Sequence, residues 1–509
     1  MNDDLDYKPF DWHARYNNID TYRSLVDLTR IYQAYWSGVY KYTGEFMLPF
    51  WTALNAFLTT EKDKLVRHQP EDSIRDYLEL LQFNLQVAQK GQASSLEAMG
   101  DYHAEKTGRV FKAWLNTFGQ TDGETLHEVF AREAELLEKV VYTYPAAIRD
   151  IKAEYGFHFD GQRYLKTAET ERFELYQVLP RDGSTPRDTG KPILIIPPYV
   201  LGANILAFLP GENRSYVHAY ADQGIPTYIR IIKDIHATEA VQTMSGEADT
   251  LDIRNFCELL QQKYGRAVTL NGFCQGGFVA LAGVLTGELD GLVDALITCV
   301  APMDGTRSAA LIEYLEHLPP RFRDLGYARK LLPSGNQVVD GKVMSWVYKL
   351  KSMESEAPLY TFYRDLKMFD TDNGRKLNVS KTAAAINNWL IYDRNDLPES
   401  ITKMSFDSYT VPITADGTLP IQLFGRKLNL LRLKEKNLPL LLCYGRNDDL
   451  VDKEAALAPL DFVDAEVTCF PKGHGAIATS WSHPDSEYAL HKRFNDGSRG
   501  PVRFQLDLQ

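Results

Sequence analysis

Cysteine is scarce in this chain, with five residues among 509, an odd number without regular spacing. Such a set forms neither a disulfide framework nor a CxxC metal site, so we expect no bound metal. Cys299, Cys443 and Cys469 lie in apolar runs typical of buried strands, and Cys257 lies in a helical pattern, where cysteine behaves as a small hydrophobe. Only Cys274 is flanked by glycines, which makes it the candidate for chemistry.

A basic surplus and a long hydrophobic run are also missing. The formal net charge is -12, whereas phosphate recognition needs a concentrated basic surface, so nucleic-acid binding is not expected. The longest uncharged apolar stretch, "FMLPFWTALNAFLTT" (Phe46–Thr60), is too short to span a bilayer, so we expect no transmembrane segment. The N-terminus "MNDDLDYKPF" is acidic and polar, unlike a secretory signal, and a cytoplasmic protein is expected.

From about Tyr22 to Tyr155 the sequence has a helical rhythm. After Pro70, apolar residues recur at steps of three and four, which predicts an amphipathic helix; they are Ile74, Tyr77, Leu78, Leu81 and Leu85. The preceding segment gathers aromatic residues, which form either a packed helical core or an exposed surface for an apolar partner or a second subunit. These residues are Tyr32, Tyr35, Trp36, Tyr40, Tyr42, Phe46, Phe50 and Trp51.

After Gly156 short β-rich runs alternate with helical stretches. The runs are "RFELYQVL", "KPILIIPP", "PTYIRII", "AVTLNGF", "DALITCVA", "LPLLLCYG" and "AEVTCFP". Several are continuously apolar, as in parallel strands covered on both faces. We predict a helical N-terminal region (1–155) and an α/β domain (156–509). More than a hundred residues without this alternation, about 306–436, predict a cap over the carboxyl ends of the strands, where α/β ligands bind.

One motif stands at the end of a predicted strand. In "TLNGFCQGGFVAL" (Thr269–Leu281) a β-branched and apolar approach meets Gly-x-Cys-x-Gly-Gly and then a helical pattern. A strand-turn-helix elbow holds its central residue on a strained turn above the sheet, and flanking glycines let neighbouring backbone approach. The pattern indicates a nucleophile at Cys274.

The elbow needs a base and an acid, which follow the nucleophile in chain order acid, then base. "LPLLLCYGRNDDLVD" leaves a strand and meets Asp448, our preferred acid, and "AEVTCFPKGHGAIA" leaves the next and meets His474, our preferred base. His236 is the rival base and Asp304 the rival acid. Asp449 is expected to be solvated or to support the acid.

An oxyanion hole should accompany this triad. One donor is expected to be the backbone N–H of Gln275, directly after the nucleophile. The second should come from the loop after "PILIIPP". Since Pro197 and Pro198 have no N–H, Tyr199 or Val200 is the expected donor.

Over about Phe157–Ser482 the chain resembles the polyhydroxyalkanoate synthase family. "GFCQGG" resembles the lipase-like box of the synthases, "GRNDDLV" their Gly-x-x-Asp-x-Ile-Val element and "KGHG" the segment of their catalytic histidine. "IIPPYVLGANILAFLP", "SYVHAYADQG" and "NNWLIYDRNDLP" resemble the loop after the third strand, the first helix and a cap segment. The resemblance implies an α/β-hydrolase fold with Cys274 as acyl acceptor, Asp448 as acid and His474 as base.

The loop after the paired prolines departs from the synthase pattern x-Ile-Asn-Lys-aromatic-Tyr-Ile-Leu-Asp, because Tyr199–Ala207 lacks the polar Asn-Lys and the Asp. Asp449 stands where synthases commonly carry histidine. Intracellular polyhydroxyalkanoate depolymerases share a cysteine nucleophile, an Asp-Asp pair near the acid and a segment like "APMDGTRSAA".

The resemblance implies an acyltransferase that polymerises (R)-3-hydroxyacyl groups from coenzyme A thioesters, with no cofactor. The alternatives are a depolymerase or thioesterase with the same triad, and an inactive granule-associated protein. The expected partners are the acyl-CoA substrate, the polyester chain and, for the N-terminal region, a homodimer or a helical partner subunit. Association with polyester granules in the cytoplasm is implied.

Overall fold

The computed structural model describes residues 18–67, 70–119, 121–184, 190–309, 312, 315, 325–344, 358–370 and 379–509. Its contacts divide the chain into two compact units. The helical unit comprises the described residues within 1–55, 81–150 and 352–384. The sheet unit comprises those within 56–80, 151–351 and 385–509. The helical unit thus takes in a segment of the cap insertion, and the predicted division into two domains at residue 155 stays a prediction.

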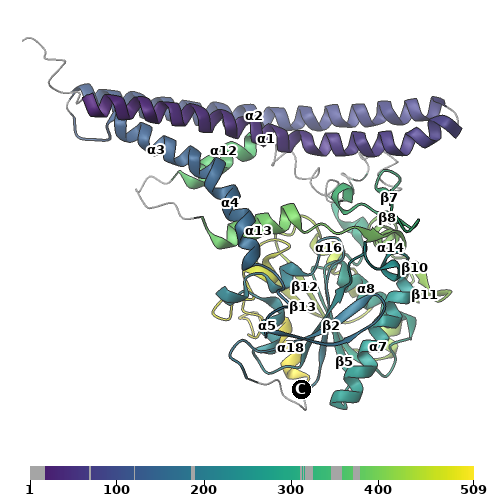
Figure 1. Ribbon diagram of the computed structural model, residues 1–509. Coiled ribbons are helices and arrows are strands. Elements are labelled where there is room, and N and C mark those ends of the chain that lie inside the picture. The colour runs from purple at the N-terminus through teal and green to yellow at the C-terminus, as the bar shows by residue number, and fades with distance from the viewer. Residues whose placement is uncertain are drawn as a thin grey trace, which may run out of the picture. The chain divides into compact units, whose positions relative to one another are not determined.

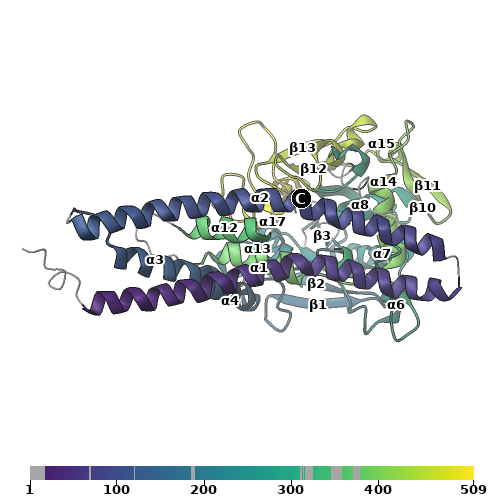
Figure 2. The ribbon, with the colours of Figure 1, turned by 90° about the horizontal axis from the view of Figure 1, so that it is seen from above.

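Two long helices dominate the helical unit, and a short helix from the cap insertion packs between them (Figure 2). Tyr35 on the first helix hydrogen-bonds to Tyr363 of the cap segment at 2.7 Å, and Lys106 on the second helix bridges to Asp370 directly after that segment at 2.9 Å. A Cβ on Gly38 would lie 2.6 Å from the ring of Phe362, so this glycine permits the close approach. The elements that contribute to this unit are α1 (Asn18–Arg67) and α2 (Pro70–Gly119), whose residues 56–80 belong to the sheet unit, and α3 (Leu126–Glu138), η1 (Lys139–Thr143), α4 (Tyr144–Asp150) and α12 (Pro358–Phe369).

The predicted amphipathic helix lies within α2, and its apolar face is exposed rather than packed. All five apolar residues that defined it have large exposed fractions, from 42% for Tyr77 to 62% for Leu85. The aromatic side chains of α1 differ in exposure, and some are buried while others face solvent. Tyr42 is buried, whereas Tyr40 and Trp36 are 83% and 54% exposed; Tyr32 and Trp51 are exposed too, Tyr35 is half-buried, and the side chains of Phe46 and Phe50 lie outside the described ones.

No helix in the described part of the chain is both long and apolar enough to cross a membrane.

The sheet unit is built on an eight-stranded, mostly parallel sheet with helices around it (Figure 1). The strand order is β1-β2-β4-β3-β5-β6-β12-β13, and only the pairs β1–β2 and β2–β4 are antiparallel. The strands are β1 (Tyr164–Glu169), β2 (Phe173–Val178), β3 (Ile193–Ile196), β4 (Thr227–Ile232), β5 (Val268–Phe273), β6 (Val293–Cys299), β12 (Leu440–Gly445) and β13 (Glu466–Phe470).

All seven strands predicted from apolar runs are present. The side chains of β3 and β5 are buried throughout, as expected for central strands covered on both faces. The edge strand β1 was not predicted, because most of its side chains are exposed and it has no apolar run. Cys257, Cys299 and Cys443 are buried and Cys469 is half-buried in β13, in the predicted elements.

Helices connect successive strands of the sheet and close its faces. The helix α7 starts at Ser245, whose hydroxyl accepts the N–H of Ala248, and ends at Gly265 with φ 65°. The helices are η2 (Ile151–Ala153), η3 (Asn204–Ala207), η4 (Pro210–Glu212), α5 (Tyr216–Ala221), α6 (Glu239–Gln242), α7 (Gly246–Tyr264), α8 (Gln275–Thr286), η5 (Gly305–Arg307), α16 (Lys453–Ala456), η6 (Ala458–Asp461), α17 (Ala476–Thr479) and α18 (Pro501–Asp507).

The insertion between β6 and β12 supplies the cap. Its described residues form two small sheets, β7-β8-β9 and β10-β11, and the helices α13, α14 and α15 besides α12. Its elements are β7 (Arg329–Leu331), β8 (Gln337–Val339), α13 (Lys381–Tyr392), β9 (Leu397–Pro398), α14 (Glu399–Thr410), β10 (Thr418–Leu423), β11 (Arg426–Asn429) and α15 (Leu431–Glu435). The strand order, the elbow after the fifth strand and the cap before the last two strands define an α/β-hydrolase fold.

Candidate active site

The elbow that carries Cys274 joins β5 to α8. Cys274 has φ 52° and ψ -125°, a backbone conformation that residues with side chains rarely adopt. Its N–H donates to the carbonyl oxygen of Cys299 at 2.8 Å, and its own carbonyl accepts from the N–H of Gly277 at 2.9 Å. These bonds hold the strained backbone from both sides, and the residue is only 4% exposed.

The glycines around Cys274 are dictated by close backbone contact. A Cβ on Gly276 would lie 2.1 Å from the carbonyl oxygen of Ile196, and one on Gly272 would lie 2.3 Å from backbone atoms of Gly276 and Gly277. Because backbone atoms rather than flexible side chains occupy these places, no side chain can be accommodated without moving the elbow. The glycines of the Gly-x-Cys-x-Gly-Gly pattern are therefore required by the geometry of the turn.

Asp448 and His474 lie together at the carboxyl ends of β12 and β13. The Nδ1 atom of His474 is 2.8 Å from Oδ2 of Asp448. The other carboxylate oxygen of Asp448 accepts the N–H groups of Leu450 and Val451 at 3.0 and 2.9 Å. These bonds fix the carboxylate, and the carboxylate in turn orients the imidazole with Nε2 directed away from Asp448.

The pKa of His474 lies above its ordinary value, and the pKa of Asp448 lies below its own. Burial alone favours a low pKa for His474, but the charges of Asp448 and then Cys274 raise the pKa well above its ordinary value. Burial alone raises the pKa of Asp448, but the charge of His474 and the hydrogen bonds bring this pKa below its ordinary value. The Nε2 atom of His474 is buried, and a side-chain hydrogen bond to Cys274 is a further cause of the raised pKa. The arrangement stabilises the imidazolium that forms when His474 takes a proton from Cys274, and it keeps the carboxylate of Asp448 ionised.

The glycines before the acid and the base let their two loops touch. A Cβ on Gly445 would lie 3.1 Å from the carbonyl oxygen of Lys472, and one on Gly473 would lie 3.1 Å from that of Asn447. The N–H of Asn447 donates to the carbonyl of Lys472 at 3.1 Å. This contact between parallel neighbours places Asp448 beside His474, although 26 residues separate them in sequence.

The rival residues make other contacts. Nε2 of His236 lies 3.3 Å from Oδ2 of Asp396, and the His236 side chain is 54% exposed. Asp304 is buried and accepts from the side chain of Arg307 at 3.2 Å and from the N–H of Ile413 at 3.2 Å, besides the backbone of Thr306. Asp304 therefore ties η5 to the cap. Asp449 is exposed next to the buried Asp448.

The two expected oxyanion donors of the loop differ in their partners. The N–H of Val200 donates to the side-chain Oε1 of Gln275 at 3.1 Å. The N–H of Tyr199 has no acceptor in the described part of the chain. The N–H of Gln275 opens α8, where the first N–H groups lack partners within the helix.

A cavity of about 660 Å³ lies at the carboxyl ends of β3 and β4, beside this loop. Cap residues close its other side, including Lys330, Asp340 and Leu397, and Phe157, Phe159 and Phe173 contribute aromatic surface. None of the three proposed triad residues lines it. The loop after β3 is shared, since it lines the cavity through Tyr199 and contacts the elbow through Val200.

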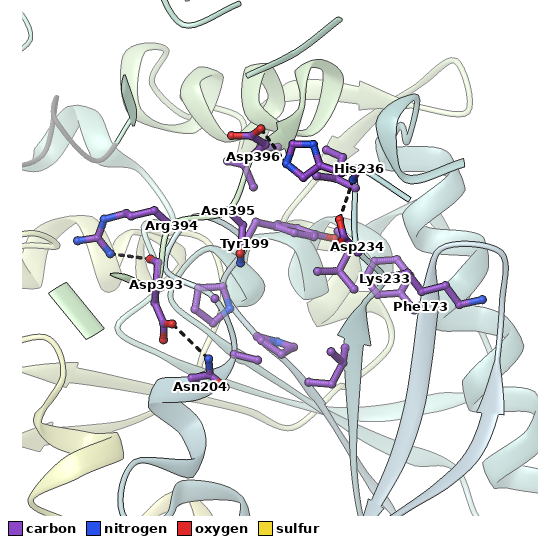
Figure 3. Close-up of a pocket in the computed structure, with 18 of the residues that line it drawn as sticks. Phe173, Tyr199, Asn204, Lys233, Asp234, His236, Asp393, Arg394, Asn395 and Asp396 are labelled. Atoms are coloured by element: carbon purple, nitrogen blue, oxygen red, sulfur yellow. Dashed lines mark hydrogen bonds and ion pairs between the residues drawn. The ribbon is translucent and has the colours of Figure 1, made fainter. Parts of the chain in front are cut away.

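Charged groups of both signs line this cavity (Figure 3). The carboxylate of Asp393 accepts from Tyr155 at 2.6 Å and from Asn204 at 3.2 Å, and burial raises its pKa. His236 and Asp396 form a second pair on the cavity wall (Figure 3). The contact between Asp393 and Asn204 joins the cap to the segment that follows the proposed oxyanion loop.

A buried ion pair behind Tyr199 was not foreseen from the sequence. Arg230 on β4 bridges to Asp249 on α7 at 2.5 Å, and both side chains are fully buried. The hydroxyl of Tyr199 donates to Asp249 at 2.7 Å and accepts from Arg230 at 3.0 Å. The available signal was an arginine in the middle of the apolar run "PTYIRII", since a buried charge must be paired.

No family model and no curated protein matches the chain. Solved structures resemble it at low identity. A carboxylesterase from Nitrososphaera gargenis is 14% identical, with 62% of this chain and 92% of that chain covered and a TM-score of 0.36. Carboxylesterase CesB from Bacillus subtilis is 11% identical over 67% and 94% of the two chains, with a TM-score of 0.33. Esterase RhEst1 from Rhodococcus sp. ECU1013 is 12% identical over 68% and 97%, also with a TM-score of 0.33. At these identities the likeness concerns the fold alone.

Proposed function

We propose that this protein is a cysteine-dependent acyltransferase of the polyhydroxyalkanoate synthase type. The observation that supports it is a cysteine on a strained elbow in one unit with a buried carboxylate–imidazole pair, whose histidine pKa is raised partly by that cysteine. A thiol needs a neighbouring base to become a good nucleophile at neutral pH. His474, held by Asp448, is the proposed base.

In the first half-reaction the proton of the Cys274 thiol moves to Nε2 of His474. The thiolate attacks the carbonyl carbon of an (R)-3-hydroxyacyl-CoA, and the negative charge on the carbonyl oxygen is held by backbone N–H groups. Collapse of this intermediate breaks the bond to the coenzyme A sulfur, which leaves with the proton from His474. The exchange replaces one thioester with another, so the acyl group is kept without a large loss of free energy.

In the second half-reaction His474 accepts the proton of a hydroxyl group on a growing chain or second acyl unit. The hydroxyl oxygen attacks the acyl carbon on Cys274, an ester forms, and the Cys274 sulfur leaves and regains the proton. Hydrolysis, the alternative, uses the same side chains with water in place of the hydroxyl. The deep burial of Cys274 favours acyl transfer, because limited access of water protects the acyl-enzyme.

The helical unit is proposed to serve association with the polyester or with another helical subunit, in the cytoplasm and at polymer granules. Its apolar side chains support this, because α1 and α2 expose many of them, including Tyr40 and Leu85. Contiguous exposed apolar surface is characteristic of interaction sites. Cys274, Asp448 and His474 all belong to the other unit.

The proposal is tested by incubating the purified protein with (R)-3-hydroxybutyryl-CoA and measuring both released coenzyme A and the acyl product. Release of coenzyme A with formation of polyester is expected. Release with the free acid as the product would instead identify a thioesterase or depolymerase. Absence of release would support the inactive granule-associated protein.

A further inference from the structure

The loop after β3 contains a tight turn that side chains from other elements hold at both central residues. The N–H of Gly202 donates to the carbonyl of Tyr199 at 3.3 Å, and Gly202 has φ 66°, which favours glycine. Of the central residues, Val200 gives its N–H to Gln275 at 3.1 Å. The carbonyl of Leu201 accepts the indole N–H of Trp389 at 3.0 Å. The turn is therefore attached to the elbow on one side and to α13 of the cap on the other.

The side chain of Gln275 extends the attachment to a second cap helix. Its Nε2 donates to the hydroxyl oxygen of Ser405 on α14 at 2.7 Å. Gln275 is 7% exposed and Ser405 8% exposed, so little water competes for either bond. Because a buried amide that loses a partner incurs a desolvation cost, the amide favours the geometry in which both ends are bonded. The position of α14 is thereby linked to the position of Val200.

Trp389 provides an independent link. It is 8% exposed, and its ring lies 3.9 Å from the place a Cβ on Gly475 would take, directly after His474. The same side chain thus donates its N–H to the oxyanion loop and places its ring beside the histidine loop. A shift of α13 would disturb both loops.

Of the two donors expected from the sequence, Tyr199 and Val200, these contacts leave only the N–H of Tyr199 without a partner in the described residues. Val200 has given its N–H to Gln275. The Tyr199 side chain is fixed by Asp249 and Arg230. The donor therefore stands on a residue whose side chain and following peptide are both held.

We propose that Gln275, Ser405 and Trp389 are positioning residues that hold the Tyr199 N–H toward the oxyanion, so that the oxyanion hole is complete only when α13 and α14 of the cap are in place. The inference rests on the proposed function, since it assumes acylation of Cys274. It assigns the second oxyanion donor to Tyr199 rather than Val200. It also couples the cap to the chemical step without a cap residue touching the reacting atoms.

The test compares two reactions of the same thiol in the full-length protein. Acylation by (R)-3-hydroxybutyryl-CoA creates an oxyanion, whereas alkylation by iodoacetamide displaces iodide without one. Gln275→Met removes the polar bonds and keeps similar side-chain bulk, and Trp389→Phe removes the indole N–H and keeps an aromatic ring. We expect each substitution to slow single-turnover acylation by about 10- to 100-fold, which is less than the loss expected when an oxyanion-hole donor is removed. The rate of alkylation should change by less than about twofold, because alkylation forms no oxyanion.

The matched control lies on the same cap helix. Ser408 is buried on α14 like Ser405, but its hydroxyl donates to the Ser405 carbonyl within the helix and not to Gln275. Ser405→Ala should slow acylation, whereas Ser408→Ala should leave it unchanged. Thermal unfolding of each variant checks that the fold is retained.

Three results would overturn the inference. Acylation at the wild-type rate in Gln275→Met and Trp389→Phe would show that the turn needs no such support. Parallel losses of acylation and alkylation would show that these residues maintain the thiol or the fold instead. A wild-type protein that is alkylated at Cys274 but never acylated would refute the proposed function itself, and the inference with it.

Discussion

The helical unit and the sheet unit differ in how completely their charged side chains are buried and in how much apolar surface they expose. In the sheet unit, polar groups such as Arg230 and Asp249 are buried and paired with each other. In the helical unit, α1 buries Ser24 and Ala34 while large apolar side chains such as Tyr40 are exposed. Buried, paired charges hold a backbone in one position, whereas exposed apolar area favours association. The comparison teaches that the sheet unit is organised around a site and the helical unit around a surface.

The largest expected effect is at the nucleophile. Cys274→Ala should abolish turnover while the protein stays folded, because the substitution removes the covalent acceptor and only one sulfur atom. Cys274→Ser should keep little activity, since the histidine is matched to a thiol. Release of coenzyme A and circular dichroism measure the two properties. Turnover by Cys274→Ala at the wild-type rate would contradict covalent catalysis.

The next largest effect distinguishes the proposed triad acid from a second buried aspartate of the sheet unit. Asp448→Asn should lower the rate of coenzyme A release by about 10³- to 10⁴-fold, because it removes the charge that orients and stabilises protonated His474. Asp304→Asn should lower it far less, since Asp304 bonds to Arg307 and to backbone of the cap. If Asp304→Asn proved the more damaging, the triad acid would have to be reassigned.

A third prediction compares ion pairs in the two units. Arg230→Met should lower the free energy of unfolding by about 3–5 kcal/mol, because it leaves the buried Asp249 carboxylate without its partner. Arg132 of the helical unit pairs with Glu124 at 2.8 Å, with 33% and 35% of the two side chains exposed. Arg132→Met should cost no more than about 1 kcal/mol, since water screens this pair. Urea denaturation measures both, and equal losses would remove the contrast between the units.

The Asp448–His474 pair predicts a pH dependence of stability. The raised pKa of His474 stabilises the fold fully below the ordinary histidine value of 6.5, and this contribution is lost as the pH rises through the folded-state pKa. The lowered pKa of Asp448 stabilises the fold above the ordinary value of 3.8, and this contribution is lost as the pH falls through the folded-state pKa. The difference in melting temperature between wild type and His474→Gln should therefore be largest between pH 3.8 and pH 6.5, the two ordinary pKa values, and should shrink at lower and higher pH. A constant difference from pH 4 to pH 9 would argue against the pair.

The smallest expected effect on stability concerns the exposed surface. Trp36→Gln with Tyr40→Gln should change the free energy of unfolding by less than about 0.5 kcal/mol per residue, because both side chains are largely exposed. The same variant should lose oligomer size or polyester affinity. Tyr42, which is buried and donates to Asp365 at 2.8 Å, is the control. Tyr42→Ala should destabilise the helical unit by several times as much.

Size-exclusion chromatography and sedimentation with polyester granules measure that association. A variant with unchanged oligomeric state and undiminished polymer affinity would refute the role proposed for the exposed aromatic residues.

The sequence by itself determined the strands, the elbow and the order of the candidate triad. Apolar runs such as that of β3 are typical of covered strands, and Gly272 and Gly276 follow from backbone contacts that exclude a Cβ. These constraints act within a few consecutive residues, so the sequence of a short segment is enough to predict the strand or the turn. The edge strand β1 was missed because an exposed strand carries no apolar run.

Only the tertiary structure decided which groups meet. Val200, Gln275 and Ser405 are spread over 200–405 in the chain, yet two hydrogen bonds join them. Likewise, the aromatic pattern of α1 is equally compatible with a core and with a surface, and only the tertiary structure buries Tyr42 and leaves Tyr40 exposed. The physical reason is that hydrogen bonding and burial depend on partners brought together by folding, and spacing along one segment carries no information about partners from another.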